Sequence, residues 1–280
     1  MKISILLCVI VFLLSSALAQ EAAPAPTAHE FGWKNNLVSG LTMTQVAFTD
    51  WAQGGESALS YTISAAGRSV DEESTTNWTT IYKFAFGQTR LGNEGLRKAD
   101  DMIDLSSVLT YKLDSYVNPY ISATLKTQFA AGYVYDAHGI GNPVSQFFDP
   151  AYITQTAGAG FQPLREIKTR LGLGLREIIT NQFRQYTTDN EKVSVDGGFE
   201  SVIEINWHLD ENVLFTTQLS LFEPFKTMDV VVVRDNSSIT ARVSKYITTI
   251  LNVQLINEKH VDPRTQVKEG LALGLSYTLF

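Results

Sequence analysis

Two pairs of aspartate and histidine come closest, by residue type and spacing, to a reactive site. Asp136 lies two residues before His138, and His260 lies two residues before Asp262. A carboxylate beside an imidazole can activate a water molecule or contribute ligands to a metal ion. Solvated loop residues are the simpler interpretation of both pairs, and the sequence favours it. We therefore expect no catalytic residue, no metal site and no cofactor.

Nucleophilic chemistry has no support in the sequence either. Hydrolases that act from a membrane-embedded strand carry a histidine and a serine two residues apart, so that the imidazole activates the hydroxyl. None of His138, His208 and His260 has a serine at that spacing after it. The single cysteine, Cys8, lies in an apolar leader, so thiol catalysis is excluded for the exported chain. We expect that the protein is not an enzyme.

A second set of residues points to a different chemistry, the selection of a solute by charge. Charged side chains occupy alternate positions in segments whose other positions are apolar, which makes them candidates for the lining of a lumen. They are Lys83, Lys112, Lys126, Arg170, Arg176, Glu200, Glu204 and Arg242. Inward-facing charge can create a field that selects small polar or anionic solutes. Arg170 and Arg176 could instead pair with Glu200 and Glu204 and so fill the lumen. Both interpretations stay open.

Strands must position these charges, because apolar residues recur with a period of two along most of the chain. Leu171, Leu173 and Leu175, for example, alternate with arginine and glycine. A period of two places successive side chains on opposite faces of a sheet. The pattern predicts twelve strands, and the tenth is interrupted by the polar residues 234–238. They lie near residues 37–48, 57–68, 77–90, 101–113, 117–131, 151–162, 167–179, 193–208, 211–222, 229–243, 246–257 and 267–280.

The connections between these strands decide between two all-β folds, a soluble sandwich and a membrane barrel. Even-numbered connections are mostly tight, such as residues 209–210, and odd-numbered ones are mostly long, such as residues 132–150. The second connection, residues 69–76, is longer than this rule expects. Short periplasmic turns, long outer loops and an even strand number are typical of outer-membrane barrels. We therefore predict a transmembrane antiparallel up-and-down β-barrel of about twelve strands.

Aromatic residues gather at one end of the predicted strands, the periplasmic end if the odd-numbered strands run outward. They are Trp78, Tyr82, Tyr111, Trp207, Tyr246 and Tyr277. Such rings sit at the level of lipid headgroups, with the apolar part in hydrocarbon and the polar tip in water. We predict that they form a periplasmic aromatic girdle. The terminal Phe280 resembles the signal by which outer-membrane barrels are recognised for insertion, although it is out of phase with Tyr277.

The amino terminus has the features of an export signal. Lys2 precedes an apolar run, and Ala17-Leu18-Ala19 has the small residues of a cleavage site. We predict a signal peptide over residues 1–19, a flexible periplasmic lead-in over 20–36 and the barrel over 37–280. The formal net charge of −7 argues against nucleic acid as a partner.

Four stretches of the chain have a distinctive sequence. They are "FTDWAQGGESALS" at 48–60, "RKADDMIDLSSVLTYKL" at 97–113, "TQFAAGYVYD" at 127–136 and "QFFDPAYIT" at 146–154. These stretches resemble the domain of unknown function family three-zero-seven-eight, a group of bacterial proteins expected to be outer-membrane barrels. Asp50 and Ala99 stand where the family pattern has asparagine and threonine. The resemblance implies a barrel and no catalytic residue, because the biochemical role of the family is itself unknown.

Two functions fit these observations. The first is a narrow passive pore for small polar or anionic solutes in the outer membrane of a Gram-negative envelope. The second is a non-conducting structural or surface-interaction barrel that serves envelope assembly or partner binding. Either would contact outer-membrane lipid, and the barrel-assembly machinery during insertion, and either could bind a periplasmic or surface protein. The sequence does not separate the two.

Overall fold

The fold is a closed barrel of antiparallel strands. The computed structural model describes residues 31–48, 55–113, 116–187, 190–227, 230–244, 246–259 and 261–278. The predicted signal peptide and the terminal Phe280 lie outside these residues. In the part of the chain that is described, no helix is long and apolar enough to cross a membrane.

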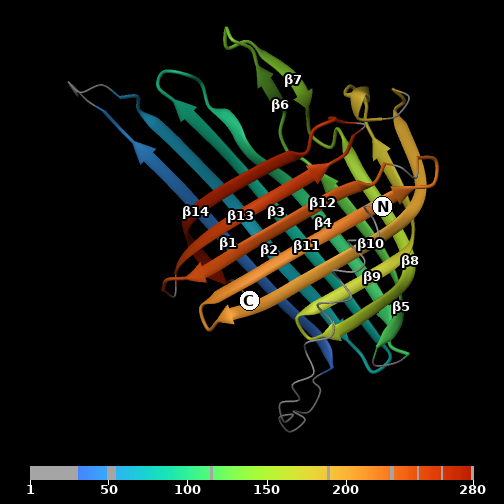
Figure 1. Cartoon of the computed structure of the whole chain (residues 1–280). Coiled ribbons are helices and arrows are strands. Elements are labelled where there is room, and N and C mark those ends of the chain that lie inside the picture. Colours follow the sequence, from blue (N-terminus) through green and yellow to red (C-terminus); the bar gives the residue numbers. More distant parts are fainter. Residues whose placement is uncertain are drawn as a thin grey trace, which may run out of the picture. The chain divides into compact units, whose positions relative to one another are not determined.

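Twelve of the described strands close the barrel, in the order β1-β14-β13-β12-β11-β10-β9-β8-β5-β4-β3-β2. Their bounds are β1 Gly32–Val46, β2 Ala58–Glu72, β3 Thr76–Leu91, β4 Arg97–Tyr111, β5 Val117–Thr127, β8 Ala151–Leu164, β9 Ile167–Ile179, β10 Val193–Asp210, β11 Val213–Pro224, β12 Val232–Arg242, β13 Ile247–Asn257 and β14 Gln266–Thr278. A separate hairpin of β6 (Gly132–Tyr135) and β7 (Gly141–Ser145) extends beyond the barrel strands (Figure 1), and η1 (Arg184–Tyr186) is a single 3-10 turn.

The barrel closes where its first and last strands meet. β1 and β14, the blue and dark-red strands of Figure 1, pair antiparallel with Leu41 opposite Leu275. β1 also pairs with β2 from one end to the other. The pairing of β1 with β14 joins residues 38–42 to residues 274–278, and it satisfies backbone groups that would otherwise cost several kcal/mol each in lipid. The final strand therefore has two roles. It pairs with β1 to close the barrel, and it presents an apolar face to lipid.

All twelve predicted strands are present, with differences at their ends. β1 begins at Gly32, so residues 32–36, which were expected in the lead-in, belong to the barrel. Trp33 pairs with Asp71 of β2, and only residues 73–75 connect β2 to β3. The prediction of a long second connection was therefore wrong. Polar residues such as Asp71 continue a strand past its apolar part without changing its backbone pairing.

The connections divide the barrel into two ends. At the turn end every connection has five residues or fewer, and at the loop end all connections except residues 92–96 are longer than five residues. The turn-end connections are residues 73–75, 112–116, 165–166, 211–212 and 243–246, and the loop-end connections are residues 47–57, 92–96, 128–150, 180–192, 225–231 and 258–265. Five of the six loop-end connections are therefore longer than every turn-end connection, as expected for an outer-membrane barrel.

The outer wall is apolar and exposed. Leu171, Leu173 and Leu175 of β9 are 60%, 57% and 51% exposed, and Leu271 of β14 is 77% exposed. A soluble monomer rarely exposes a continuous apolar surface larger than a few hundred Å². Lipid is the environment in which such a wall is stable, and the chain is a transmembrane β-barrel.

Candidate functional site: the lumen and its loop-end rim

The lumen is lined by the second face of each strand, which carries polar and charged side chains. Three cavities lie along it among the described residues, with volumes of about 180, 60 and 240 Å³. Lys126 and Arg234 line both the first and the second, and Arg170 lines both the second and the third. The shared residues place the three cavities in series, with the smallest in the middle.

An ion bridge spans the lumen on the loop-end side. Glu258, which directly follows β13, accepts hydrogen bonds from Arg176 of β9 at 2.5 Å and from Arg234 of β12 at 2.8 Å. Both guanidinium groups lie over the ring of Tyr152, at 5.5 and 4.6 Å from its centroid. β9 and β12 are not neighbours in the sheet, because β10 and β11 lie between them. The bridge therefore ties two separated parts of the wall together.

Glu258 is ionised in this bridge. Burial alone would raise the pKa of its carboxyl group, but the charges of Arg176 and Arg234 outweigh burial and lower the pKa to about 2. Its side chain is only 3% exposed. One buried carboxylate thus compensates two guanidinium charges.

The smallest of the three cavities, about 60 Å³, lies in the middle of the lumen. Thr156 donates a hydrogen bond of 2.5 Å to Glu200, and Lys126 lies 3.7 Å from Asp104. The hydroxyl of Tyr120 is buried without a hydrogen-bond partner among the described residues. Gly172 of β9 permits this packing, because a Cβ atom there would lie 2.8 Å from the Tyr120 hydroxyl oxygen.

The turn end of the lumen has the largest internal space, the 240 Å³ cavity. Arg170 donates to Glu204 at 2.8 Å, and Lys112 forms an ion pair with Glu72. Arg68 also lines this cavity. Its wall contains paired and unpaired charges side by side, unlike the bridge at the loop end.

The predicted lumen charges have different surroundings. The ion pair expected between Arg170 and Glu204 is present, whereas Arg176 pairs with Glu258 instead of Glu200. Lys83 shares the inward face of β3 with Ile81, a residue of the turn-end cavity. Arg242 ends β12 at the turn end, and neither cation has an ion pair with a described residue.

Sequence reasoning missed the two residues that complete the bridge. Arg234 falls in the polar interruption of the tenth predicted strand, but the strand continues through it as β12 and Arg234 keeps the inward phase of Val232. That phase was a usable signal. Glu258 gave none, because it lies in a connection and its partner Arg176 is 82 residues away in sequence.

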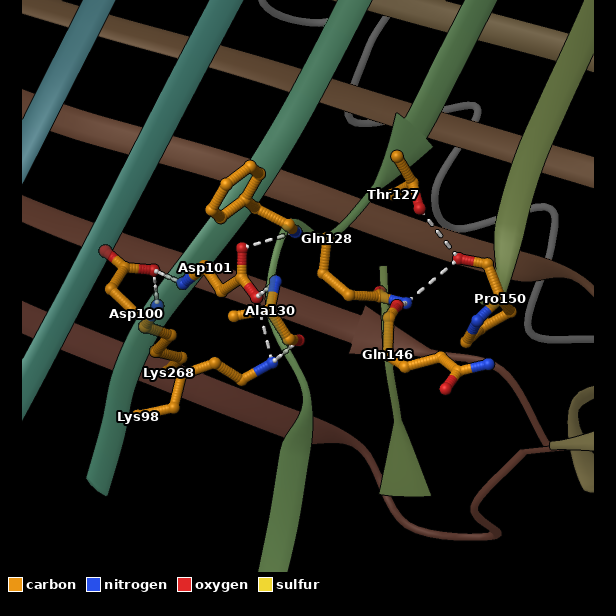
Figure 2. Close-up of polar contacts among 10 residues, drawn as sticks. Lys98, Asp100, Asp101, Thr127, Gln128, Ala130, Gln146, Pro150 and Lys268 are labelled. Carbon is orange, nitrogen blue, oxygen red and sulfur yellow. Dashed lines mark hydrogen bonds and ion pairs between the residues drawn. The ribbon is translucent and has the colours of Figure 1, made fainter. Parts of the chain in front are cut away.

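The loop-end rim contains a second polar network, centred on Asp101 of β4 (Figure 2). Its carboxylate accepts hydrogen bonds from the backbone N–H groups of Phe129 and Ala130 at 2.7 and 2.8 Å. Lys98 donates both to this carboxylate and to the carbonyl of Ala130, each at 2.9 Å. Two residues of β4 therefore fix the segment that leads from β5 into the β6–β7 hairpin.

The other side of the hairpin base is held by Gln128 and Thr127, also drawn in Figure 2. Gln128 donates to the carbonyls of Gln146 and Pro150 at 2.9 and 3.3 Å, and Thr127 donates to Pro150 at 3.0 Å. The segments that enter and leave the hairpin are thereby joined. Three of the four distinctive sequence stretches contribute to this network, which gives them a structural role.

Asp149 extends the rim network to the connection after β9. Its carboxylate accepts hydrogen bonds from Thr180 Oγ1 at 2.5 Å and from the N–H groups of Asn181 and Gln182 at 3.1 and 2.9 Å. Burial would raise the pKa of this carboxyl group, but the hydrogen bonds from Thr180, Gln182 and Asn181 outweigh burial and lower it. Asp149 is therefore an ionised cap for a loop.

The aspartates of the two Asp–His pairs bond to groups of their own loops in the part of the chain that is described. Asp136 accepts hydrogen bonds from the N–H groups of His138 and Ile140, both at 2.9 Å, and so closes the tip of the hairpin. Asp262 is bound by Arg264, and His260 lies outside the described residues. No group of three potential metal ligands occurs among the described residues.

The predicted girdle aromatics lie toward the turn end. Trp78, Tyr111, Trp207 and Tyr246 are each between 45% and 49% exposed. The ring of Tyr82 instead lies over Gly67 of β2, where a Cβ atom would be 2.2 Å from a ring carbon. Glycine at this outer position makes room for an aromatic ring across the strands. The structure does not describe the side chain of Tyr277.

One family model matches part of the chain. Residues 43–133 match the family described as "Protein of unknown function (DUF3078)". The resemblance noted from the sequence is confirmed over these residues. The DUF3078 match includes the rim residues Lys98 and Asp101, whereas the bridge residues Arg176 and Glu258 lie beyond it. No curated protein matches the chain in sequence.

Solved structures that align with this chain are bacterial β-barrels. An outer membrane channel from Pseudomonas putida F1 is 11% identical, with 92% of this chain and 99% of that chain covered and a TM-score of 0.40. The translocator domain of the autotransporter NalP from Neisseria meningitidis is 8% identical, with coverages of 98% and 95% and a TM-score of 0.38. The NanC porin is 11% identical, with coverages of 88% and 98% and a TM-score of 0.37.

Proposed function

We propose that the protein is an outer-membrane β-barrel that passes small polar or anionic solutes through a narrow lumen, and that the Arg176–Glu258–Arg234 bridge closes this lumen in the present conformation. The observation that carries the proposal is the origin of Glu258. It comes from a connection and not from a strand, so it can leave the lumen without breaking any pairing of the barrel wall.

The charge along the lumen favours anions. The turn-end cavity is lined by Arg68, Lys112, Lys168 and Arg170 against two glutamates. Rings or patches of basic side chains select for anions in pores. The 60 Å³ cavity in the middle limits the passage to small solutes.

Single-channel recording tests this proposal. Purified full-length protein in planar bilayers is expected to show small or infrequent conductance steps, and Glu258→Gln is expected to make the steps larger or more frequent. Glu211→Gln is the matched control, because Glu211 lies exposed in a turn-end connection and its removal leaves the lumen unchanged. Bilayers that stay silent with the wild type and with Glu258→Gln would contradict a pore.

One observation favours the alternative, a non-conducting barrel that binds a partner. The β6–β7 hairpin presents Tyr133, Val134 and Ile140, which are 47%, 60% and 62% exposed, and the rim network holds its base in place. A rigid apolar hairpin is a suitable contact surface for a protein outside the membrane. Silent bilayers together with a partner that is lost on replacement of Tyr133 and Val134 by serine would favour this function.

The apolar wall supports our proposal of an outer-membrane location, with membrane lipid and the barrel-assembly machinery as partners. Lipid covers the apolar wall, and closed barrels with short turns and long loops are typical of bacterial outer membranes. The turn end would then face the periplasm, and insertion would require the barrel-assembly machinery. Protease treatment of intact cells checks the orientation, since a cut within residues 136–140 is expected only if the hairpin is outside.

A further inference from the structure

We infer that the turn-end cavity is a binding site for a small anion with several oxygen acceptors, such as a dicarboxylate or a phosphate. The inference deepens the proposed function, and its meaning for transport rests on that function, but binding itself can be measured separately. The basis of the inference is the balance of charge around the turn-end cavity.

Four basic and two acidic side chains line the cavity. Lys112 is paired with Glu72, and Arg170 is paired with Glu204. Arg68 and Lys168 line the same cavity and form no ion pair with any described residue. Two positive charges therefore remain after the internal pairs are made.

Like charges that share a lumen with low-dielectric walls repel one another more strongly than in bulk water. The opposite end shows how this protein compensates such charges with its own carboxylate, because Glu258 bridges Arg176 and Arg234. Lys168 lies opposite Glu204 in the pairing of β9 with β10, but that carboxylate is bonded to Arg170, and neither Arg68 nor Lys168 has an ion pair with a described residue. A bound anion would supply the missing compensation.

The rest of the lining suits an oxygen-rich anion. Thr110 and Gln162 contribute a hydroxyl and an amide to the same wall. A guanidinium group presents a planar fork of N–H donors that matches a carboxylate or a phosphate, and an ammonium group adds a compact charge. Arg68 and Lys168 combine the two kinds of donor.

The sequence of cavities along the lumen places the proposed site next to the smallest cavity. The cavity of 240 Å³ is followed by the middle cavity of 60 Å³, and Arg170 lines both. A solute that enters from the turn end meets the wide, cationic space before the constriction. The site would hold an anion directly before the narrowest step.

Isothermal titration calorimetry on the full chain in detergent micelles tests the site. The probes are inorganic phosphate and succinate, with glucose as an uncharged comparison. We expect saturable binding of at least one anion and none of glucose. The double variant Arg68→Gln and Lys168→Gln is expected to bind at least tenfold more weakly, since each lost charged hydrogen bond is worth about 1.5 kcal/mol or more.

Two further variants protect the test against a general loss of charge or of folding. Arg242→Gln removes a cation at the turn end that does not line the cavity, and its affinity is expected to stay within about twofold of the wild type. Glu204→Gln removes a competing carboxylate, and its affinity is expected to rise. The absence of saturable anion binding in the wild type, or an equal loss in Arg242→Gln, would overturn the inference.

The result also separates this site from the proposed pore. Anion binding by a protein that is silent in bilayers would keep the site and reject conduction. Conduction without any saturable anion binding would keep the pore and reject the site.

Discussion

The two ends of the lumen differ in how the charges of their basic side chains are compensated. At the loop end, Arg176 and Arg234 share one buried carboxylate, and all three side chains are 20% exposed or less. At the turn end, Arg170 pairs with Glu204, which also lies opposite Lys168 in the sheet, and neither Arg68 nor Lys168 has an ion pair with a described residue. Charge is compensated where the lumen is closed and left uncompensated where it is open.

The difference follows from the cost of desolvation. A charge that loses its water must be paired and hydrogen-bonded, or it destabilises the fold by several kcal/mol. A charge beside a water-filled space keeps part of its hydration and can remain unpaired. The end that leaves charges without an ion pair is therefore the one at which a solute can compete for them.

The largest expected effect comes from removing the shared carboxylate. Glu258→Gln leaves two buried guanidinium groups without a counter-ion and should lower the free energy of unfolding by about 3–5 kcal/mol. Glu204→Gln, its turn-end counterpart, should cost less, because Glu204 has an ion pair with Arg170 alone, whereas Glu258 compensates two guanidinium groups. Urea unfolding from lipid bilayers measures both, and equal costs would break the comparison between the two ends.

A somewhat smaller effect tests whether the charges at both ends share one inward face. Leu125 and Lys126 are neighbours on β5, and only Lys126 lines the lumen cavities. Leu125→Arg should cost about 2–4 kcal/mol by placing a charge in lipid, whereas Lys126→Ala should fold almost normally. Folding yield into bilayers, read from the migration of unboiled protein on a denaturing gel, would show similar losses for the two variants if the faces were misassigned.

Acid should act on the loop end through Glu258. Its folded-state pKa of about 2 lies below the ordinary value of 4.5, so its stabilising contribution is fully present above pH 4.5 and is lost as the pH falls through about 2. The conductance of the wild type should therefore stay constant between pH 7 and pH 4.5 and increase only in stronger acid. A Glu258→Gln protein with the same acid step would assign the effect to another group.

The smallest expected effect is on selectivity at the turn end. Arg68→Gln should leave stability almost unchanged, because Arg68 has no ion pair to lose. It should shift the reversal potential in a salt gradient toward less preference for anions. An unchanged reversal potential would mean that the turn-end charges do not govern which ions enter.

The sequence predicts the barrel well because period-two alternation is a local property. Each strand needs only its own apolar face, and a segment such as residues 167–179 reveals that face without knowledge of its neighbours. The strand ends were less predictable. Whether Trp33 continues β1 depends on its pairing with Asp71 of β2, which no local pattern contains.

The site was predicted only in part, for a related reason. The inward phase of Lys126 and Arg170 can be read from their own strands, and the pair of Arg170 with Glu204 follows from adjacent strands. Glu258 lies in a connection, and its contacts depend on how a loop enters a closed lumen. Such a contact requires the three-dimensional course of the chain.

The bridge depends on the last hairpin of the barrel. Arg176 lies on β9 and Arg234 on β12, while the carboxylate that joins them arrives only with the connection between β13 and β14, the last hairpin of the barrel. Strands β1 to β12 alone lack the group that neutralises these two arginines. Until that last hairpin is in place, Arg176 and Arg234 have no carboxylate between them, so the bridge can form only together with the closure of the wall.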